Sequence, residues 1–171
     1  MNHRGENVSA ITADLLRSEF HYDPETGIFT NRVLRRSAKP GDRAGTMKPN
    51  GYRRIGIQKR YYYEHRLAWL YMTGSWPDGE IDHANGDPSD NRWCNLRQAT
   101  RSQQGANRPI QKNNTTGLKG VQWHKVRKRW MASISVNKKA ICLGFFDTRE
   151  AAYEAYCTAS DKFYGPYARV A

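Results

Sequence analysis

The chain has 171 residues and carries 28 Lys and Arg against 16 Asp and Glu, which gives a formal net charge of +12 and a pI near 9.8. Its hydrophobic content of 38% and mean hydropathy of −0.88 are typical of a soluble, polar protein, and no apolar run is long enough to span a bilayer. So large a basic excess favours a polyanionic partner, most often nucleic acid. An anionic membrane surface is the alternative, but no basic amphipathic helix supports it.

Helical and hairpin patterns alternate in the N-terminal half. The opening residues, MNHRGENVSA, lack the apolar segment of a signal peptide, so we expect the protein to stay in the compartment where it is made. Between the two hairpins, residues 31–48 are basic and rich in turn formers, and they form either a loop that contacts phosphates or a solvated linker. The predicted elements are a helix over 8–19, hairpins over 20–29 and 51–63, the second turning at Gln58-Lys59, and a helix over 64–73 that Gly74 ends.

The next stretch, residues 80–108, reads EIDHANGDPSDNRWCNLRQATRSQQGANR. Asp82 and His83 follow a short run with strand character and precede a polar loop, and the last third has helical character. An imidazole beside a carboxylate, with side-chain amides downstream, offers a base that can activate water and oxygen ligands for a hard divalent cation. Taken alone, the Asp-His pair is more often part of a loop that simply makes turns.

A polar segment around Pro109 divides the chain, and a β-rich pattern follows it. Split at residue 116, the chain has a net charge of about +6 on each side, so we expect both parts to face the same polyanion. The small side chains expected on one face of the last helix would let it lie close against a sheet. The predicted elements are strands over 118–123, 129–136 and 140–146 and a helix that begins after Thr148 as N-cap, with Ala151, Ala152, Ala155, Tyr156 and Ala159 on its inner face.

Three cysteines are scattered through the sequence: Cys94, Cys142 and Cys157. Their spacing fits no CxxC or Cys/His arrangement for zinc, so we expect no structural zinc site. Free, buried thiols in a reducing cytoplasm are the simplest interpretation.

Residues 81–108 resemble the HNH nucleases, in particular the phage and intron-encoded homing endonucleases. The resemblance rests on Asp-His, a polar loop, Asp-Asn-Arg, Asn-Leu-Arg and a short final helix. It continues upstream through HRLAWLYMTGSWPDGE and FHYDPETGIFTNR. The family fold is a ββα-metal finger, in which two strands, a loop and a helix clamp one divalent ion. The resemblance therefore implies an endonuclease that hydrolyses phosphodiester bonds in duplex DNA, either of the homing type or encoded by a free-standing phage gene.

The resemblance also implies roles for individual residues. His83 would be the general base, and Asp82 would bind the metal, Mg²⁺ in preference to Mn²⁺. Asn95 would bridge the loop and orient the histidine. The last ligand position falls on Gln104, where relatives more often have Asn in a Ser-Gln-Asn or Ser-Glu-Asn run. An active nuclease, a weakened one and a DNA-binding protein with a degenerate core are the three outcomes, and we expect retained activity because the other three residues are intact.

Several neighbours in this segment have two interpretations. Asn91 is expected to stabilise the loop by an Asx-type hydrogen bond rather than to bind metal. Arg92, Arg97 and Arg101 either contact phosphates or are ordinary surface arginines. Trp93 is expected in the core.

The C-terminal part resembles an AP2 DNA-binding domain, on the runs GLKGVQWHKVRKRWMASI, LGFFDTREAAYEAY and YGPYARV. In that family a three-stranded sheet lies in the major groove, where Arg suits guanine and Gln suits adenine. The alternative is that about half of the matching residues do not contact bases and are solvated or touch only phosphate. The DNA-contacting positions that the resemblance implies are Lys119, Gln122, His124, Lys125, Arg127, Arg129, Trp130, Ser133 and Ser135.

The sequence thus predicts an α+β protein with two functional modules. A sequence-specific DNA-binding protein with an inactive HNH core is the alternative to a nuclease, and an RNA-directed protein is a further one. We expect a monomer with duplex DNA as partner and no membrane association. The predicted segments are a β-rich extension with hairpins and a helix over 1–64, an HNH core over 65–108, a linker over 109–116, and an AP2-like sheet with one packed helix over 117–171.

Overall fold

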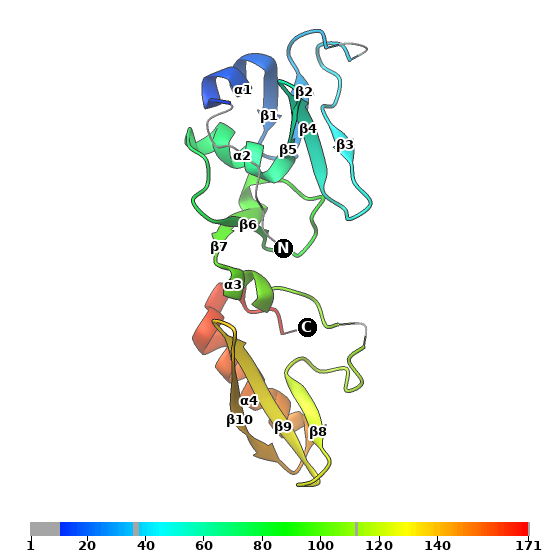
Figure 1. The fold of residues 1–171 in the computed structure, drawn as a ribbon, viewed down its shortest axis with the longest axis vertical. Coiled ribbons are helices and arrows are strands. Elements are labelled where there is room, and N and C mark those ends of the chain that lie inside the picture. Colours follow the sequence, from blue (N-terminus) through cyan, green and yellow to red (C-terminus); the bar gives the residue numbers. More distant parts are fainter. Residues whose placement is uncertain (1–10, 36–37, 112, 171) are drawn as a thin grey trace. The chain divides into compact units, whose positions relative to one another are not determined.

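The structure, a computed structural model, describes residues 11–35, 38–111 and 113–170. The chain forms two compact units, Met1–Gln98 and Ala99–Ala171 (Figure 1). No helix in the described ranges is both long and apolar enough to cross a membrane. Each unit has its own hydrophobic core, so the two are described separately.

The first unit begins with a short helix and a hairpin. Helix α1 (Ala13–Glu19) starts at Thr12, whose side chain accepts a hydrogen bond from the Leu15 amide at 3.2 Å. Strands β1 (Phe20–Asp23) and β2 (Ile28–Asn31) pair antiparallel, which confirms the first predicted hairpin. The helix was predicted over 8–19. Among the described residues it begins at Ala13, and residues 8–10 lie outside the described residues.

A three-stranded sheet and a second helix follow. Strands β3 (Thr46–Met47), β4 (Arg53–Ile57) and β5 (Arg60–Tyr63) are antiparallel, with β4 in the centre (Figure 1). Gln58 and Lys59 turn between β4 and β5 with φ of 50° and 65°, the positive values that a tight hairpin turn requires. The second predicted hairpin is therefore confirmed.

Helix α2 (Glu64–Thr73) follows β5 directly and ends at Gly74, which has φ of 79°. Glycine adopts this left-handed conformation without a steric penalty, so the predicted helix and its stop are both confirmed. Leu67 and Leu70 point into the core and are almost completely buried. The same core takes in side chains from α1 and from both hairpins: Leu16, Phe20, Tyr22, Phe29, Ile55 and Ile57.

Two further strands close the first unit. Strand β6 (Glu80–His83) and strand β7 (Leu96–Ala99) are neighbours in a two-stranded sheet, and a long loop joins them through a 3₁₀ turn, η1 (Trp93–Asn95). Asp82 and His83 thus lie within the strand and not after it. Trp93 packs against the core with its ring 5.2 Å from that of Trp69, although it is only partly buried.

In the second unit a sheet packs against one long helix. Strands β8 (Val121–His124), β9 (Arg129–Val136) and β10 (Lys139–Phe146) are antiparallel in the order β10-β9-β8. Helix α4 (Arg149–Tyr164) is capped by Thr148 and lies along one face of the sheet (Figure 1), and a 3₁₀ turn, η2 (Gly165–Tyr167), follows it. The three predicted strands and the helix are present, although β8 begins at Val121 and not at residue 118. Small side chains such as Ala132 and Ala152 allow the close approach.

The division between the units falls ten residues before the predicted linker over 109–116. Helix α3 (Arg101–Ala106), predicted to be part of the nuclease core, belongs to the second unit. Its Ser102 Oγ lies 3.1 Å from the Tyr164 hydroxyl, and Ala106 packs in the same cluster as Tyr156. This packing draws the helix onto α4.

The two structural units differ in net charge. Residues up to Gln98 include 15 Lys and Arg against 12 Asp and Glu, whereas residues from Ala99 onward include 13 against 4. The second unit therefore carries +9 of the net +12, and the first only +3. The even split of about +6 each came from a boundary placed inside the second unit.

The prediction of buried thiols was wrong. The three cysteines are free, but Cys94 and Cys142 are exposed and Cys157 is only partly buried. Cys94 lies on the outer side of η1 between two inward-packed neighbours. Cys142 lies opposite Ser133 on the sheet, on the face away from α4.

Candidate functional site

The two strands of the small sheet bring Asp82 and Arg97 together. Asp82 is 6% exposed, and its Oδ2 accepts hydrogen bonds from Arg97 Nε at 3.0 Å and from Nη2 at 2.9 Å. A guanidinium on a neighbouring strand offsets the cost of burying this carboxylate. Arg97, which was predicted to contact phosphate, is thus engaged with the predicted metal ligand.

His83 lies beside Asp82, 4% exposed, and contacts a different partner. Its Nε2 lies 3.0 Å from Asn91 Oδ1, and Asn91 Nδ2 donates to Glu64 Oε2 at 2.7 Å. Tyr22 donates its hydroxyl hydrogen to the Asn91 carbonyl at 2.7 Å. The prediction that Asn91 makes an Asx-type loop bond was wrong, because its side chain points inward and links β6 to the start of α2.

Glu64 is completely buried at the first position of α2. Burial raises its pKa to about 7, against the lowering effects of Arg53 and Arg43. Arg53 Nε lies 3.9 Å from Oε2, and hydrogen bonding from Asn91 and from the Phe29 amide also opposes the rise in pKa. Sequence reasoning missed Glu64, because an acidic residue in a first helical turn is ordinarily explained by the helix dipole.

Aromatic rings line the other side of His83. The His65 ring lies 5.2 Å away and the Tyr52 ring 5.9 Å away, and Tyr63 stacks on His65 at 5.6 Å. Burial, together with nearby His83, lowers the pKa of His65 to about 3, so His65 is neutral at physiological pH. His83 is thus bounded by uncharged rings, and no sequence signal distinguished His65 from a core residue.

Asn95 ties together the loop that follows His83. Its Nδ2 donates to the Asp90 carbonyl at 2.7 Å and to Asn85 Oδ1 at 3.0 Å, and its Oδ1 accepts from the Asn85 amide at 3.0 Å. The Asn95 carbonyl accepts a hydrogen bond from the Ala84 amide at 2.9 Å. These bonds hold the loop against the sheet, while the amide that contacts the His83 ring is that of Asn91.

Arg92 is held by the same loop. It donates to both oxygens of Asp90, at 2.8 Å and 2.6 Å, and is half exposed. These hydrogen bonds lower the pKa of Asp90 to about 2 and raise that of Arg92. Arg92 therefore stabilises the loop in addition to any contact with a phosphate.

The predicted last ligand, Gln104, lies on α3 in the second unit and is partly buried. Its neighbour Gln103 makes a capping box with Thr100: Gln103 Oε1 accepts from the Thr100 amide at 2.8 Å, and the Thr100 hydroxyl accepts from the Gln103 amide at 3.3 Å. The capping box occupies the Gln103 carbonyl, so of the two neighbouring glutamines Gln104 is the one whose amide has no capping role.

The donor set suits a hard cation. In the described ranges no group of three or more His, Cys, Asp or Glu side chains is placed to hold a metal ion. Mg²⁺ is commonly held by one or two carboxylates, with water and substrate phosphate completing its shell. A single carboxylate at Asp82, supplemented by an amide oxygen, fits that chemistry.

In the second unit, the sheet face away from α4 carries most of the residues predicted to contact DNA. Trp130 does not lie on that face: it packs with the cluster around Ala132 and Ala152, with its ring 5.2 Å from Trp123. Trp130 therefore lies on the helix side. Strand pairing places on the opposite face Gln122, His124, Arg129, Ser133 and Ser135.

One end of this face is aromatic and basic. The His124 ring lies edge-on to Phe145 at 5.2 Å, and the Arg127 guanidinium lies over Phe145 at 4.6 Å. Arg129 forms an exposed ion pair with Asp147 at 3.0 Å. Lys125 is exposed in the turn between β8 and β9.

Lys119 is hydrogen-bonded to the backbone of the second unit. Its ammonium donates to three carbonyl oxygens: that of Ala106, that of Arg108 at 2.7 Å and that of Arg169 at 3.0 Å. Burial lowers its pKa to about 8. All three hydrogens are donated to carbonyl oxygens within the second unit, so a contact between Lys119 and DNA would have to replace one of these bonds.

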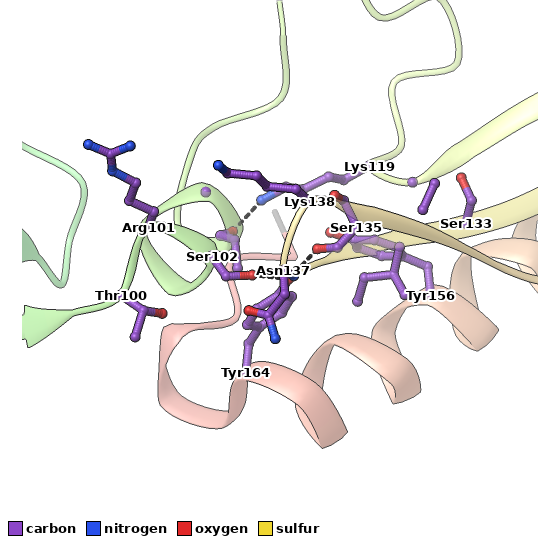
Figure 2. Close-up of a pocket in the computed structure, with 15 residues that line it drawn as sticks. Thr100, Arg101, Ser102, Lys119, Ser133, Ser135, Asn137, Lys138, Tyr156 and Tyr164 are labelled. Atoms are coloured by element: carbon purple, nitrogen blue, oxygen red, sulfur yellow. Dashed lines mark hydrogen bonds between the residues drawn. The ribbon is translucent and has the colours of Figure 1, made fainter. Parts of the chain in front are cut away.

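Lys119 also borders a cavity of about 810 Å³ between α3, β9 and α4 (Figure 2). At one end, the Ser102 hydroxyl accepts from the Asn137 amide at 3.0 Å, and Tyr164 donates to the Ser135 carbonyl. The first bond joins α3 to the turn between β9 and β10, and the second joins α4 to β9. The cavity thus ends, on this side, at hydrogen-bonded residues of all three elements.

Known proteins match both the nuclease segment and a larger part of the chain. The family model described as HNH endonuclease matches residues 62–106. Protein 3.8 of Escherichia phage T7 is 32% identical over 106 residues, which make up 61% of this chain and 87% of the phage protein. The solved structure of the HNH homing endonuclease I-HmuI, which binds and cleaves DNA, shares 18% identity over 84% of this chain and 82% of that chain, with a TM-score of 0.41.

Proposed function

This chain belongs to the HNH endonuclease family, and from that membership we propose that it is a metal-dependent endonuclease acting on duplex DNA. The observation that carries the proposal is the buried pair Asp82 and His83 at the end of β6, inside the segment that matches the family. Arg97 holds the carboxylate and Asn91 holds the imidazole. Such positioning by neighbouring hydrogen bonds is what a hydrolytic site requires.

In the proposed reaction His83 takes a proton from a water molecule. The water oxygen bonds to phosphorus, the bond from phosphorus to the 3′ oxygen breaks, and the leaving oxygen takes a proton from solvent. Asp82 would hold one divalent ion, Mg²⁺ or Mn²⁺, and Gln104 is the last ligand that the motif predicts. When bound, that ion supplies stabilisation of the negative charge on the phosphate and on the leaving oxygen.

The first prediction concerns cleavage itself. Purified protein should cut duplex DNA with Mg²⁺ and should not cut it in EDTA, and His83→Ala should lower the cleavage rate by about 10²- to 10⁴-fold because the proton acceptor is lost. His21→Ala, which removes an exposed histidine from β1, should cleave like the wild type. Absence of magnesium-dependent cleavage on DNA that contains the target would refute the proposal.

Gln104 motivates a second candidate function, a DNA-binding protein with an inactive core. The longer glutamine side chain displaces the amide oxygen relative to asparagine, and metal sites tolerate only small displacements. DNA binding that persists in EDTA without strand scission would favour this alternative. In that case Gln104→Asn should restore cleavage.

We propose that the second unit binds the DNA through the sheet face away from α4, in the manner of an AP2 domain. Its net charge of +9 and the polar and basic side chains on that face support this assignment. Gln122 and Ser133 would contact bases, while Lys125, Arg127 and Arg101 would contact phosphates. Duplex DNA should compete more strongly than RNA for this surface.

A further inference from the structure

Three side chains form a series of hydrogen bonds that joins the start of α2 to strand β6. His83, Asn91 and Glu64 are all buried, and they are linked in series at 3.0 Å and 2.7 Å. Burying a carboxylate and an amide is costly unless their hydrogen bonds are well satisfied. The simplest role is structural, since Asn91 lies in the loop and Glu64 would merely hold it.

The Asn91 amide also determines which nitrogen of the His83 ring carries the hydrogen. An ionised carboxylate can only accept hydrogen bonds, so the Asn91 NH₂ group must face Glu64. The Asn91 carbonyl oxygen then faces the His83 ring, and it too can only accept. His83 Nε2 must therefore carry the hydrogen, which leaves the lone pair on Nδ1.

We propose that Glu64 is a positioning residue for His83: acting through Asn91, it selects the tautomer in which Nε2 carries the hydrogen and Nδ1 accepts the proton of the attacking water. This inference rests on the proposed nuclease function. It assigns to α2 an indirect influence on the reacting group, because Glu64 contacts His83 only through Asn91.

The surroundings of Glu64 support the chain. Arg53 from β4 and Arg43 favour its ionised form, and the nearby Tyr22 of β1 has a raised pKa and is a neutral phenol. His83 lies on the other side of Asn91, and the His65 ring lies 5.2 Å from that of His83. A carboxylate here also stabilises the imidazolium that forms when Nδ1 takes its proton. If Glu64 is protonated it can donate, and the direction of the Asn91 amide is then no longer dictated.

Nitrogen NMR of the His83 ring tests the tautomer without relying on activity. At about pH 8, where free imidazole is neutral, the wild type should show hydrogen on Nε2, and Glu64→Gln should show a mixture of tautomers. Loss of the signal in His83→Gln assigns the resonance. A wild-type ring with hydrogen on Nδ1, or an unchanged ring in Glu64→Gln, overturns the proposal.

Cleavage kinetics give the second readout. Glu64→Gln should lower kcat by about 10- to 100-fold, the usual effect of removing a partner of a catalytic ligand, with little change in KM. Glu19→Gln is the matched control, because it removes a carboxylate that is ion-paired with Arg35 at 2.6 Å in the same unit. It should retain both kcat and the His83 tautomer.

The two proposals fail separately. If the wild type does not cleave DNA, the nuclease function fails, and the NMR comparison still decides whether Glu64 sets the tautomer. If the wild type cleaves and Glu64→Gln cleaves equally fast with the same tautomer, the function stands and the positioning role is wrong. A slower variant with a changed tautomer supports both.

Discussion

At the scale of single residues, Glu64 couples stability to pH. Its pKa in the folded protein is about 7, above the ordinary glutamate value of 4.5. The folded state therefore binds this proton more tightly than the unfolded state. The resulting stabilisation is complete below about pH 4.5 and is lost as the pH rises through about 7.

Glu64→Gln should remove this dependence. At pH 8 the variant should be more stable than the wild type, by at most about 3 kcal/mol, and near pH 4.5 the two should be similar. Thermal unfolding followed at both pH values measures the difference. Glu19→Gln should keep the pH dependence of the wild type, and an equal effect in both variants would contradict the assignment to Glu64.

The Glu64 side chain favours the proposed function at the expense of stability. A neutral side chain at position 64 would fold at least as well at pH 8, yet the proposed role needs a carboxylate. Proteins often keep such unfavourable groups at active sites. Glu64 should therefore be a position where a stabilising substitution lowers activity.

At the scale of elements, the approach of α4 to the sheet depends on Gly120, just before β8. Its φ is +72°, and a Cβ there would lie 2.0 Å from Tyr156 Cδ2 and 2.8 Å from the Ser133 carbonyl oxygen. Both contacts are too short for any side chain. Glycine is required here for the conformation and for the space.

Gly120→Ala should therefore destabilise the second unit by about 2–5 kcal/mol, from backbone strain and overpacking together. Gly117→Ala is the matched control, because its φ is +70° but no atom lies within 4 Å of the added Cβ. It should cost only about 1 kcal/mol. Urea unfolding of both variants measures the difference, and equal losses would show that the contact with Tyr156 has no energetic weight.

At the scale of the whole molecule, positive charge is concentrated in the second unit, at +9 against +3. This asymmetry predicts that most phosphate contacts, and most of the salt dependence of binding, arise there. The first unit, in contrast, nearly balances its charges and keeps its polar groups for the site around His83. Under the proposed function, the second unit would therefore supply most of the binding free energy that comes from phosphate contacts.

Lys125→Ala should weaken DNA binding and lower the slope of log K against log salt by about 1, as expected for one lost phosphate contact. Lys162→Ala removes the same charge from α4 and should leave the slope nearly unchanged. Binding measured by fluorescence anisotropy over a range of salt concentrations compares them. Equal slopes in the two variants would mean that the sheet face does not form the interface.

The sequence by itself determined the features that depend on neighbouring residues. Turn formers and periodicity placed both early hairpins, the end of α2 at Gly74 and the sheet and helix of the second unit. The motif around Asp82 and His83 was also visible, because its parts lie within one short segment. Local conformational preference and local spacing are properties of contiguous sequence.

Only the tertiary structure decided which side chains meet. Glu64 and Asn91 are 27 positions apart, and nothing in either local pattern predicts that the start of α2 lies under the loop. The assignment of α3 to the second unit likewise came from its packing on α4. Contacts of this kind arise from how the elements fold against one another, so residue spacing does not reveal them.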